Sequence, residues 1–219
     1  PLFNVLLDAG IGIFTWDKPG IGQSEGQWRD QSMQDRANEA IAAFRKIETQ
    51  TGSANAIGFL GFSQAGWVIP KATQDVTPAF SVLIGPAVSW QRQGAFFTRK
   101  RLEAEGAPED EIAAQLAINA QREWRILAPG TALALDDRRG MTRERYNFVA
   151  RNHTADASED IARMRGPVLA VWGAEDLNVD ATSDAASYAT LLPQQTTQSI
   201  VIIPDATHGL LRAGLFNYQ

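Results

Sequence analysis

The amino-acid sequence predicts an α/β fold: a mostly parallel, doubly wound sheet with a helical segment inserted between two of its strands. Short apolar runs typical of buried parallel strands alternate with patterns of helical spacing along most of the chain. This alternation stops between Gln91 and Ala155, where only helical patterns occur. Glycine-containing motifs stand at the ends of several apolar runs. Together these observations predict one globular domain.

Five apolar runs are predicted strands. They lie at residues 11–16, 56–60, 80–84, 168–172 and 200–203. Between the first two runs, apolar residues recur at helical spacing and predict a crossover helix packed on the sheet, preceded by Asp30 and Ser32 as candidate N-caps. The apolar residues of this helix are Met33, Ala37, Ile41, Phe44 and Ile47.

Residues 91–155 are predicted to form a helical cap over the edge of the sheet. Pro108 is followed by three acidic residues, an order that marks a helix start, because the helix dipole favours acidic side chains in the first turn. We therefore divide the chain into an α/β core, residues 1–90 and 156–219, and a cap insertion. One face of the helix after Pro108 is apolar and consists of Ile112, Leu116, Ala120, Trp124 and Leu127.

Composition favours a small-molecule substrate over a macromolecular partner. The 219 residues are 44% hydrophobic and carry a formal net charge of -5, without the clustered Lys and Arg that nucleic acid or an anionic membrane would need. The absence of cysteine excludes disulfides, thiolate metal sites and a cysteine nucleophile. No run approaches the roughly 20 apolar residues of a membrane span, and no signal peptide is evident. We expect a soluble chain, cytoplasmic or periplasmic, of undetermined oligomeric state.

The most informative stretch begins in the second predicted strand and ends in a turn of small residues. The order Gly61-Phe62-Ser63-Gln64-Ala65-Gly66 runs from this strand into a helix. Small residues are required there, because the serine of such a turn lies on a sharp, strained bend where the strand and helix backbones approach closely. The order and its context match a nucleophile elbow, with Ala65 in place of the usual glycine.

Three further motifs accompany this elbow, each at the end of a predicted strand. They are Trp16-Asp17-Lys18-Pro19-Gly20-Ile21-Gly22-Gln23-Ser24, Trp172-Gly173-Ala174-Glu175-Asp176-Leu177-Asn178 and Asp205-Ala206-Thr207-His208-Gly209. With all four motifs in this order, the chain resembles the α/β-hydrolase superfamily, and within it the branch of capped bacterial esterases and serine aminopeptidases. The resemblance extends over nearly the whole chain and implies an α/β-hydrolase fold with a catalytic triad.

The resemblance implies that Ser63 is the nucleophile. A serine hydroxyl is a poor nucleophile near neutral pH and needs a base, which in turn needs a group that fixes its tautomer. The family's chain order of serine, acid and histidine implies His208 as that base. The other histidine, His153, lies among polar residues at the end of the cap, where we expect a solvated side chain. The family's oxyanion hole would comprise the backbone N–H of Gln64 and a second N–H from another loop.

Several acidic residues near the fourth predicted strand are candidates for the supporting acid. Asp176 is the first choice, because it matches the family's Gly-x-x-Asp position relative to Gly173. Glu175 is expected to point elsewhere, and Asp180 is expected to act as a helix N-cap. The weaker candidates are Asp184 and Asp205.

The glycines of residues 17–24 do not indicate a phosphate-binding site. A dinucleotide fingerprint has a third glycine and an acid about 20 residues further on. The resemblance instead makes this loop a structural turn, with Asp17 and Lys18 paired or hydrogen-bonded internally. Two distant histidines and no cysteine leave no compact set of metal ligands. We therefore expect neither a cofactor nor a metal ion.

These residues and the resemblance imply hydrolysis of a carboxylic ester of small or medium size through an acyl-enzyme. Peptides and acyl-CoA thioesters remain alternative substrates, because the same triad serves all three, and a non-catalytic ligand-binding protein of this fold is a third reading.

Two sets of cap side chains are candidates for contact with the substrate, although packing and solvation are the commoner roles of such residues. The cap carries eleven Lys and Arg against nine Asp and Glu, and the rest carries nine against sixteen, so basic cap residues could favour anionic substrates. The aromatic candidates are Trp90, Phe96, Phe97, Trp124, Tyr146 and Phe148. The basic candidates are Arg92, Arg99, Arg122, Arg125, Arg143 and Arg145.

The resemblance also predicts that residues 1–219 are part of a larger catalytic unit. Members of the superfamily place about three strands before the helix expected at residues 1–8, and the loop after the third strand supplies the second oxyanion donor. A terminal helix would normally follow the histidine. We expect flanking residues or a second polypeptide to complete the fold.

Overall fold

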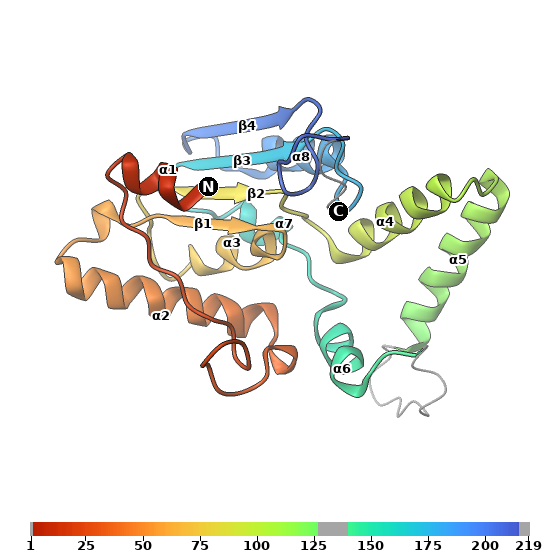
Figure 1. Cartoon of the computed structure of the whole chain (residues 1–219), viewed down its shortest axis with the longest axis horizontal. Coiled ribbons are helices and arrows are strands. Elements are labelled where there is room, and N and C mark those ends of the chain that lie inside the picture. Colours follow the sequence, from red (N-terminus) through yellow and green to blue (C-terminus); the bar gives the residue numbers. More distant parts are fainter. Residues whose placement is uncertain (1, 127–139, 215–219) are drawn as a thin grey trace.

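A computed structural model describes residues 2–126 and 140–214, and in these ranges four parallel strands form one sheet (Figure 1). In order across the sheet they are β1 (Phe59–Phe62), β2 (Ser81–Ile84), β3 (Val168–Gly173) and β4 (Gln198–Ile203). Because all neighbouring strands are parallel, their carboxyl ends meet at one edge of the sheet. The predicted α/β class with a parallel sheet is confirmed.

Four of the five predicted strands are present, with shifted ends. β1 begins at Phe59 rather than at residue 56, because the preceding residues form the 3₁₀ turn η2 (Ala54–Ala56). The other three strands differ from their predicted bounds by one or two residues. Such shifts are common, because strand ends depend on pairing with neighbours rather than on local sequence.

The first predicted strand, residues 11–16, is wrong, since these residues adopt no regular secondary structure. A strand needs ladder hydrogen bonds to a neighbour, and within the described ranges no backbone bond joins residues 11–16 to a strand. The side chains of Ile11, Phe14 and Trp16 are therefore 42%, 46% and 46% exposed. The apolar pattern predicted burial, but local sequence cannot provide the partner strand that burial requires.

Helix α2 (Met33–Thr51) is the predicted crossover helix. It begins after Ser32, whose hydroxyl and backbone N–H both bond to the aspartate at the third helical position, and it ends at Gly52 in a left-handed conformation with φ +70°. Ser32 is therefore the N-cap. The other candidate, Asp30, belongs to the 3₁₀ turn η1 (Trp28–Asp30). The buried apolar residues of α2 are Met33, Ala37, Ala40, Ile41 and Phe44.

The main hydrophobic core lies between the sheet and short helices around it. These helices are η3 (Ser63–Trp67), α3 (Ile69–Ala72), α7 (Ser158–Ile161) and α8 (Ala181–Leu191). The fully buried rings of Trp172 and Tyr188 meet edge to face with centroids 5.4 Å apart. Burial of a large apolar side chain contributes about 1.5–3 kcal/mol, so this packing fixes β3 against α8.

Helix α1 (Leu2–Asp8) occupies the position where a helix was expected at residues 1–8, and it buries none of its side chains. It is much shorter than the roughly 20 residues of a membrane span. Within the described ranges, no helix has both the length and the apolar character needed to cross a bilayer.

The segment predicted as a cap is built of helices where the structure describes it. They are α4 (Trp90–Ala104), α5 (Glu109–Ile126) and α6 (Arg143–Asn152). Figure 1 shows α4 and α5 as an arm that extends from the sheet beyond the end of β2. Leu127 and the side chain of Trp124 lie outside the described part of the chain.

A buried amide ties the end of α6 to the start of α2. The Oδ1 atom of Asn152 accepts a hydrogen bond from the Met33 N–H at 2.9 Å, and its Nδ2 atom donates to the Gln31 carbonyl at 3.0 Å. Asn152 is 3% exposed, and a buried amide of this kind is costly to leave unpaired. The chain therefore returns from the arm to the core at a defined place.

Candidate active site

The residues predicted for the triad follow three different strands at the carboxyl edge of the sheet. Ser63 follows β1, Asp176 lies three residues after β3, and His208 lies five residues after β4. In parallel α/β sheets, this edge is where loops from several strands converge and where ligands bind. The topology thus gathers residues from distant parts of the sequence.

Ser63 has a strained backbone. It begins η3 directly after β1 with φ +48°, a left-handed conformation that costs a residue with a Cβ atom about 1–2 kcal/mol. The small neighbours are a steric requirement: a Cβ atom on Gly61 would lie 2.3 Å from the Cβ of Ala65, and one on Gly66 would lie 2.8 Å from the Cβ of Pro86. Strain of this kind is concentrated at functional sites.

The carboxylate of Asp176 is buried and contacts His208. Its Oδ1 atom accepts hydrogen bonds from the N–H groups of Asn178 at 2.7 Å and Val179 at 2.9 Å. Its Oδ2 atom lies 2.6 Å from Nδ1 of His208. The side chain is 0% exposed, and these three bonds offset the cost of burying a charge. Because a carboxylate only accepts, Nδ1 is the donor in this contact.

The imidazole of His208 packs against a glycine at the end of β2. A Cβ atom on Gly85 would lie 3.0 Å from both Cε1 and Nδ1 of the ring, and Gly85 has φ +58°. The turn around His208 is held by the Leu210 N–H donating to the Thr207 carbonyl at 2.9 Å, and by the Thr207 N–H donating to the Leu211 carbonyl at 2.9 Å. Sequence reasoning missed Gly85, although a glycine directly after a predicted strand was a usable signal.

The structure brings two of the three predicted triad residues into contact. Asp176 and His208 are hydrogen-bonded, whereas among the described residues no hydrogen bond joins Ser63 to His208. Hydrogen bonds between a nucleophile and its base are often long or poorly aligned without substrate and shorten in the reacting complex. Ser63 is nevertheless held at the same edge of the sheet as the other two residues.

Comparison with models of protein families shows which family this chain belongs to. The family model described as serine aminopeptidase, S33 (Hydrolase_4) matches residues 1–213, which is nearly the whole chain. The chain belongs to the S33 serine aminopeptidase family. No curated protein gives a significant match to it.

Solved structures share the fold of this S33-family chain. BpoC from Mycobacterium tuberculosis H37Rv superposes with a TM-score of 0.58 at 18% identity, over 94% of this chain and 77% of BpoC. A monoacylglycerol lipase of Paleococcus ferrophilus gives 0.56 at 18% identity, over 94% and 79%. VinJ gives 0.56 at 14% identity, over 94% and 77%. At such identities the similarity shows the fold, which is that of the α/β hydrolases.

Gln64, the predicted oxyanion donor of this S33-family chain, is the second residue of η3. The first N–H groups of a helix have no intrahelical acceptor, so the backbone N–H of Gln64 is available for a ligand oxygen. Because Gln64 directly follows Ser63, this N–H and the serine hydroxyl arise from the same strained turn.

The remaining acidic candidates have other contacts or are exposed. Asp180 caps α8, with its Oδ1 atom accepting a hydrogen bond from the Ser183 N–H at 3.0 Å, as predicted. Glu175 and Asp205 are exposed. Asp184 is buried and contacts Val88, which precedes α4, and Arg92, in the first turn of α4. None of these four contacts a histidine within the described part of the chain.

His153 differs from its predicted environment. It is the C-cap of α6 and is half-buried rather than fully solvated, and its buried Nδ1 atom has no hydrogen-bond partner among residues 2–126 and 140–214. Burial lowers the pKa of His153, which favours the neutral imidazole. His153 follows α6, and the histidine that contacts Asp176 is His208.

The loop of residues 17–24 is a structural turn in this S33-family chain. The Gly20 N–H donates to the Ser24 carbonyl at 3.0 Å, and the Ser24 hydroxyl donates to the Asp17 carbonyl at 3.0 Å. Lys18 is not paired with Asp17 but lies over the ring of Trp28, 5.6 Å from its centroid. Within the described residues, no group of three His, Cys, Asp or Glu could hold a metal ion.

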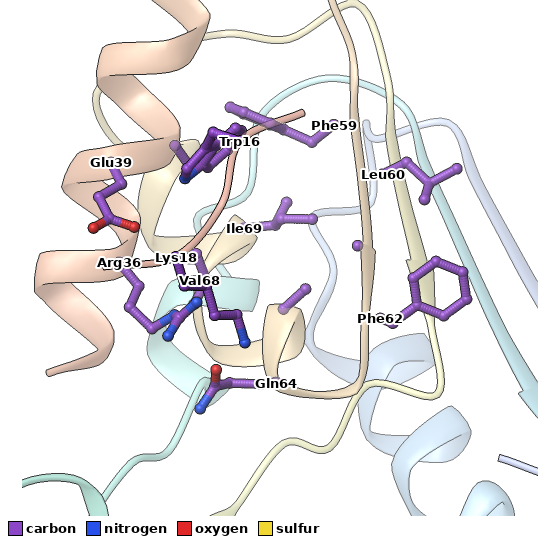
Figure 2. Close-up of a pocket in the computed structure, with 13 residues that line it drawn as sticks. Trp16, Lys18, Arg36, Glu39, Phe59, Leu60, Phe62, Gln64, Val68 and Ile69 are labelled. Atoms are coloured by element: carbon purple, nitrogen blue, oxygen red, sulfur yellow. The ribbon is translucent and has the colours of Figure 1, made fainter. Parts of the chain in front are cut away.

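A pocket lies along β1 and extends to Gln64 (Figure 2). All four residues of β1 line it, opposite Trp16 and the side of α2 that carries Arg36 and Glu39. Figure 2 shows that Lys18, Arg36 and Gln64 converge at one end, whereas the side chains of Leu60 and Phe62 point away. Burial and the nearby Arg36 lower the pKa of Lys18.

The aromatic cap candidates divide into packed and exposed side chains. The ring of Trp90 lies 5.4 Å from that of Trp67 in η3 and 6.0 Å from that of Phe148, which is buried. Phe97 is 46% exposed, and Phe96 lies under the ammonium group of Lys100. Trp90 therefore packs against η3, the helix that begins at Ser63, which supports the packing interpretation.

Two of the six basic cap candidates, Arg92 and Arg99, are paired with acids. Arg99 forms a bidentate pair with Glu109 at 2.7 and 2.9 Å on the surface between α4 and α5. Arg92 contacts Asp184 at 3.5 Å. Arg143 and Arg145 are exposed on α6, and the side chains of Arg122 and Arg125 lie outside the described part.

Proposed function

We propose that this chain is a serine hydrolase that cleaves a carboxylic ester of a small or medium-sized substrate through an acyl-enzyme. Membership in a hydrolase family supports the reaction class. The observation that carries the proposal is the 2.6 Å bond between the buried Asp176 carboxylate and Nδ1 of His208, at the same edge of the sheet as the strained turn of Ser63. Geometry of this kind serves to present Nε2 as a base.

In the proposed reaction, Nε2 of His208 removes the hydroxyl proton of Ser63 as the serine oxygen attacks the acyl carbonyl carbon. Asp176 stabilises the imidazolium that forms and keeps Nδ1 protonated. The backbone N–H of Gln64 donates to the developing oxyanion. Collapse of the tetrahedral species expels the alcohol, which takes the proton from Nε2, and leaves the acyl group on Ser63.

Deacylation repeats these steps with water as the nucleophile. His208 removes a proton from water as the water oxygen attacks the acyl carbonyl, and the Ser63 oxygen leaves with that proton. The products are the carboxylic acid and the free enzyme. No metal ion or cofactor takes part in this proposal.

Peptides and acyl-CoA thioesters are the alternative substrates, because the triad chemistry does not separate acyl leaving groups. The family description names an aminopeptidase, and one structural relative is named a monoacylglycerol lipase. A non-catalytic ligand-binding protein is a further alternative. The buried Asp176–His208 pair weighs against it, because a binder gains nothing from a charge buried to orient an imidazole.

The experiment that tests the proposal compares three substrate panels: esters of increasing acyl length, aminoacyl amides and acyl-CoA thioesters. Ester turnover that is lost on Ser63→Ala, by roughly 10⁴-fold or more in kcat, is the expected result. Amide or thioester turnover exceeding ester turnover would replace the substrate class. Undetectable turnover in all panels would favour a binding protein.

A further inference from the structure

The arm of helices joins the core through two short segments that pair with each other. We call residues 88–90 and 155–157 the neck. The Trp90 N–H donates to the Ala155 carbonyl at 2.9 Å, and the Ala157 N–H donates to the Val88 carbonyl at 2.8 Å. An antiparallel bridge between Ser89 and Asp156 completes the pairing. The orientation of α4 relative to the sheet is therefore set where the neck meets the core (Figure 1).

The indole N–H groups of two core tryptophans donate hydrogen bonds to backbone carbonyls of the neck and of the residues just before it. Nε1 of Trp67 donates to the Val88 carbonyl at 3.0 Å, and Nε1 of Trp172 donates to the Pro86 carbonyl at 2.9 Å. Trp67 ends η3, which begins at Ser63, and Trp172 lies in β3. The neck thus contacts the element that carries the proposed nucleophile.

A buried acid also contacts the neck. Asp184 stands in the first turn of α8 with its side chain 7% exposed. Its Oδ1 atom accepts from the Val88 N–H at 3.4 Å and lies 3.5 Å from Nη2 of Arg92, in the first turn of α4. Both contacts are long, so their strength depends on the charge of the carboxylate rather than on ideal hydrogen-bond geometry.

Asp184 and the proposed catalytic acid stand on one continuous stretch of backbone. Asp176 fixes the turn at residues 178–179 through Oδ1, and Asp180 then caps α8 through the Ser183 N–H. Asp184 follows one helical turn later. A displacement at Asp184 would therefore move the neck relative to Asp176 and His208.

We propose that Asp184 is a positioning residue: as a carboxylate it holds the neck through Val88 and Arg92, and it thereby fixes the arm relative to Ser63 and His208. The activity readout of this inference rests on the proposed ester hydrolysis. Asp184 does not contact the reacting atoms, so its effect should appear in how well the site accepts large acyl groups.

The charge of Asp184 is maintained against an unfavourable environment. Burial, the largest effect, raises the pKa of Asp184 to about 6, and Asp180 and Asp176 add to this, whereas Arg92 and the Val88 N–H oppose it. Tyr188 is the other titratable neighbour, and burial together with Asp184 raises its pKa, so it stays neutral. Protonation in mildly acidic solution removes the charge-dependent attraction of Asp184 for Arg92 and for the Val88 N–H, and it also removes the cost of burying the charge.

The test combines Asp184→Asn, which keeps an acceptor oxygen but removes the charge, with Arg92→Gln, which removes the partner. Asp160→Asn is the matched control, because Asp160 is also buried but pairs with Lys71 at 2.6 Å rather than with the neck. The first readout is amide hydrogen exchange at Val88, which is independent of catalysis. At pH 8 we expect exchange roughly tenfold faster in Asp184→Asn and Arg92→Gln than in wild type or the control.

The second readout is the ratio of KM values for a long-chain and an acetyl ester of the same alcohol. We expect this ratio to rise at least fivefold in Asp184→Asn and Arg92→Gln, with kcat for the acetyl ester within twofold of wild type. The difference in Val88 exchange between wild type and Asp184→Asn should vanish near pH 5. Unchanged Val88 exchange at pH 8 in both neck variants would overturn the proposal. If no ester is turned over, the exchange readout still decides the positioning role.

Discussion

Asp176 and Asp180 lie four residues apart and both accept backbone N–H groups, but only Asp176 contacts a histidine. Asp176→Asn would place an amide beside Nδ1 of His208 and favour the wrong imidazole tautomer. By precedent in serine proteases, kcat should fall about 10⁴-fold. Asp180→Asn retains an N-cap of equal quality, so kcat should change little. Equal losses of ester turnover in the two variants would show that Asp176 is not the supporting acid.

Replacement of the two histidines should have different effects on ester turnover. His208→Ala removes the proposed base and should abolish ester turnover, whereas His153→Ala removes a neutral C-cap side chain on α6 and should leave most of it. The kcat of each variant on one chromogenic ester provides the comparison. Retained turnover in His208→Ala would contradict the assignment of the base.

Gly85 provides a third prediction at this scale. In Gly85→Ala the new methyl group would lie 3.0 Å from the imidazole of His208, in addition to the strain of φ +58°. We expect kcat to fall at least about tenfold, since small displacements of catalytic groups are costly. Gly52→Ala is the control, because Gly52 has φ +70° but nothing within 4 Å of the new Cβ atom. It should lose stability by a similar amount and keep its kcat.

Sequence could predict the individual candidates better than their contacts. Ser63, Asp176 and His208 were found because each stands in a motif at the end of a strand, and two of them are indeed bonded. Gly85 was missed because its small size is required by a ring that lies 123 positions further along the chain. The partial burial of His153 was also missed, because polar sequence neighbours do not show what packs against a side chain.

At the scale of elements, prediction succeeded where local signals and neighbours agree. Helix α2 combines apolar periodicity with a capping box at Ser32 and a left-handed glycine at its end, so its sequence marks both limits. Residues 11–16 have an equally strong apolar pattern but no strand beside them within the described ranges. A helix makes its own backbone hydrogen bonds, whereas a strand depends on a partner.

The buried carboxyl of Asp184, through which α8 contacts the neck, leads to a prediction on how the stability of the fold depends on pH. Burial raises the pKa of Asp184 from 3.8 to about 6. The folded chain therefore holds this proton more tightly than the unfolded chain. Ionisation of Asp184 has no effect on stability below about pH 4 and destabilises the fold fully above about pH 6, by on the order of 3 kcal/mol.

Asp184→Asn should consequently melt at a higher temperature than wild type at pH 8 and at a similar temperature near pH 4. Thermal unfolding followed by circular dichroism at both pH values measures this difference. Asp160→Asn should instead melt lower than wild type at pH 8, because it breaks the pair with Lys71. A lower melting temperature for Asp184→Asn at pH 8 would mean that the ionised carboxylate stabilises the fold.

For the molecule as a whole, sequence predicted the parallel sheet and the helical segment between β2 and β3, and the family match and related structures confirm the α/β-hydrolase fold. The placement of the arm could not be predicted, because it depends on residues 86–88, which Trp67, Trp172 and Asp184 from three separate elements contact. The division of the chain into an α/β core, residues 1–90 and 156–219, and a cap, residues 91–155, stays a prediction.

The most direct test of the central claim is covalent labelling of the purified protein with a fluorophosphonate probe, followed by mass spectrometry of the peptides. Only a serine activated by a base reacts readily with such an electrophile. We expect one adduct per chain, located on Ser63, and no adduct in Ser63→Ala or His208→Ala. A wild-type protein that stays unlabelled, or an adduct that persists unchanged in Ser63→Ala, would contradict the assignment of Ser63 as an activated nucleophile.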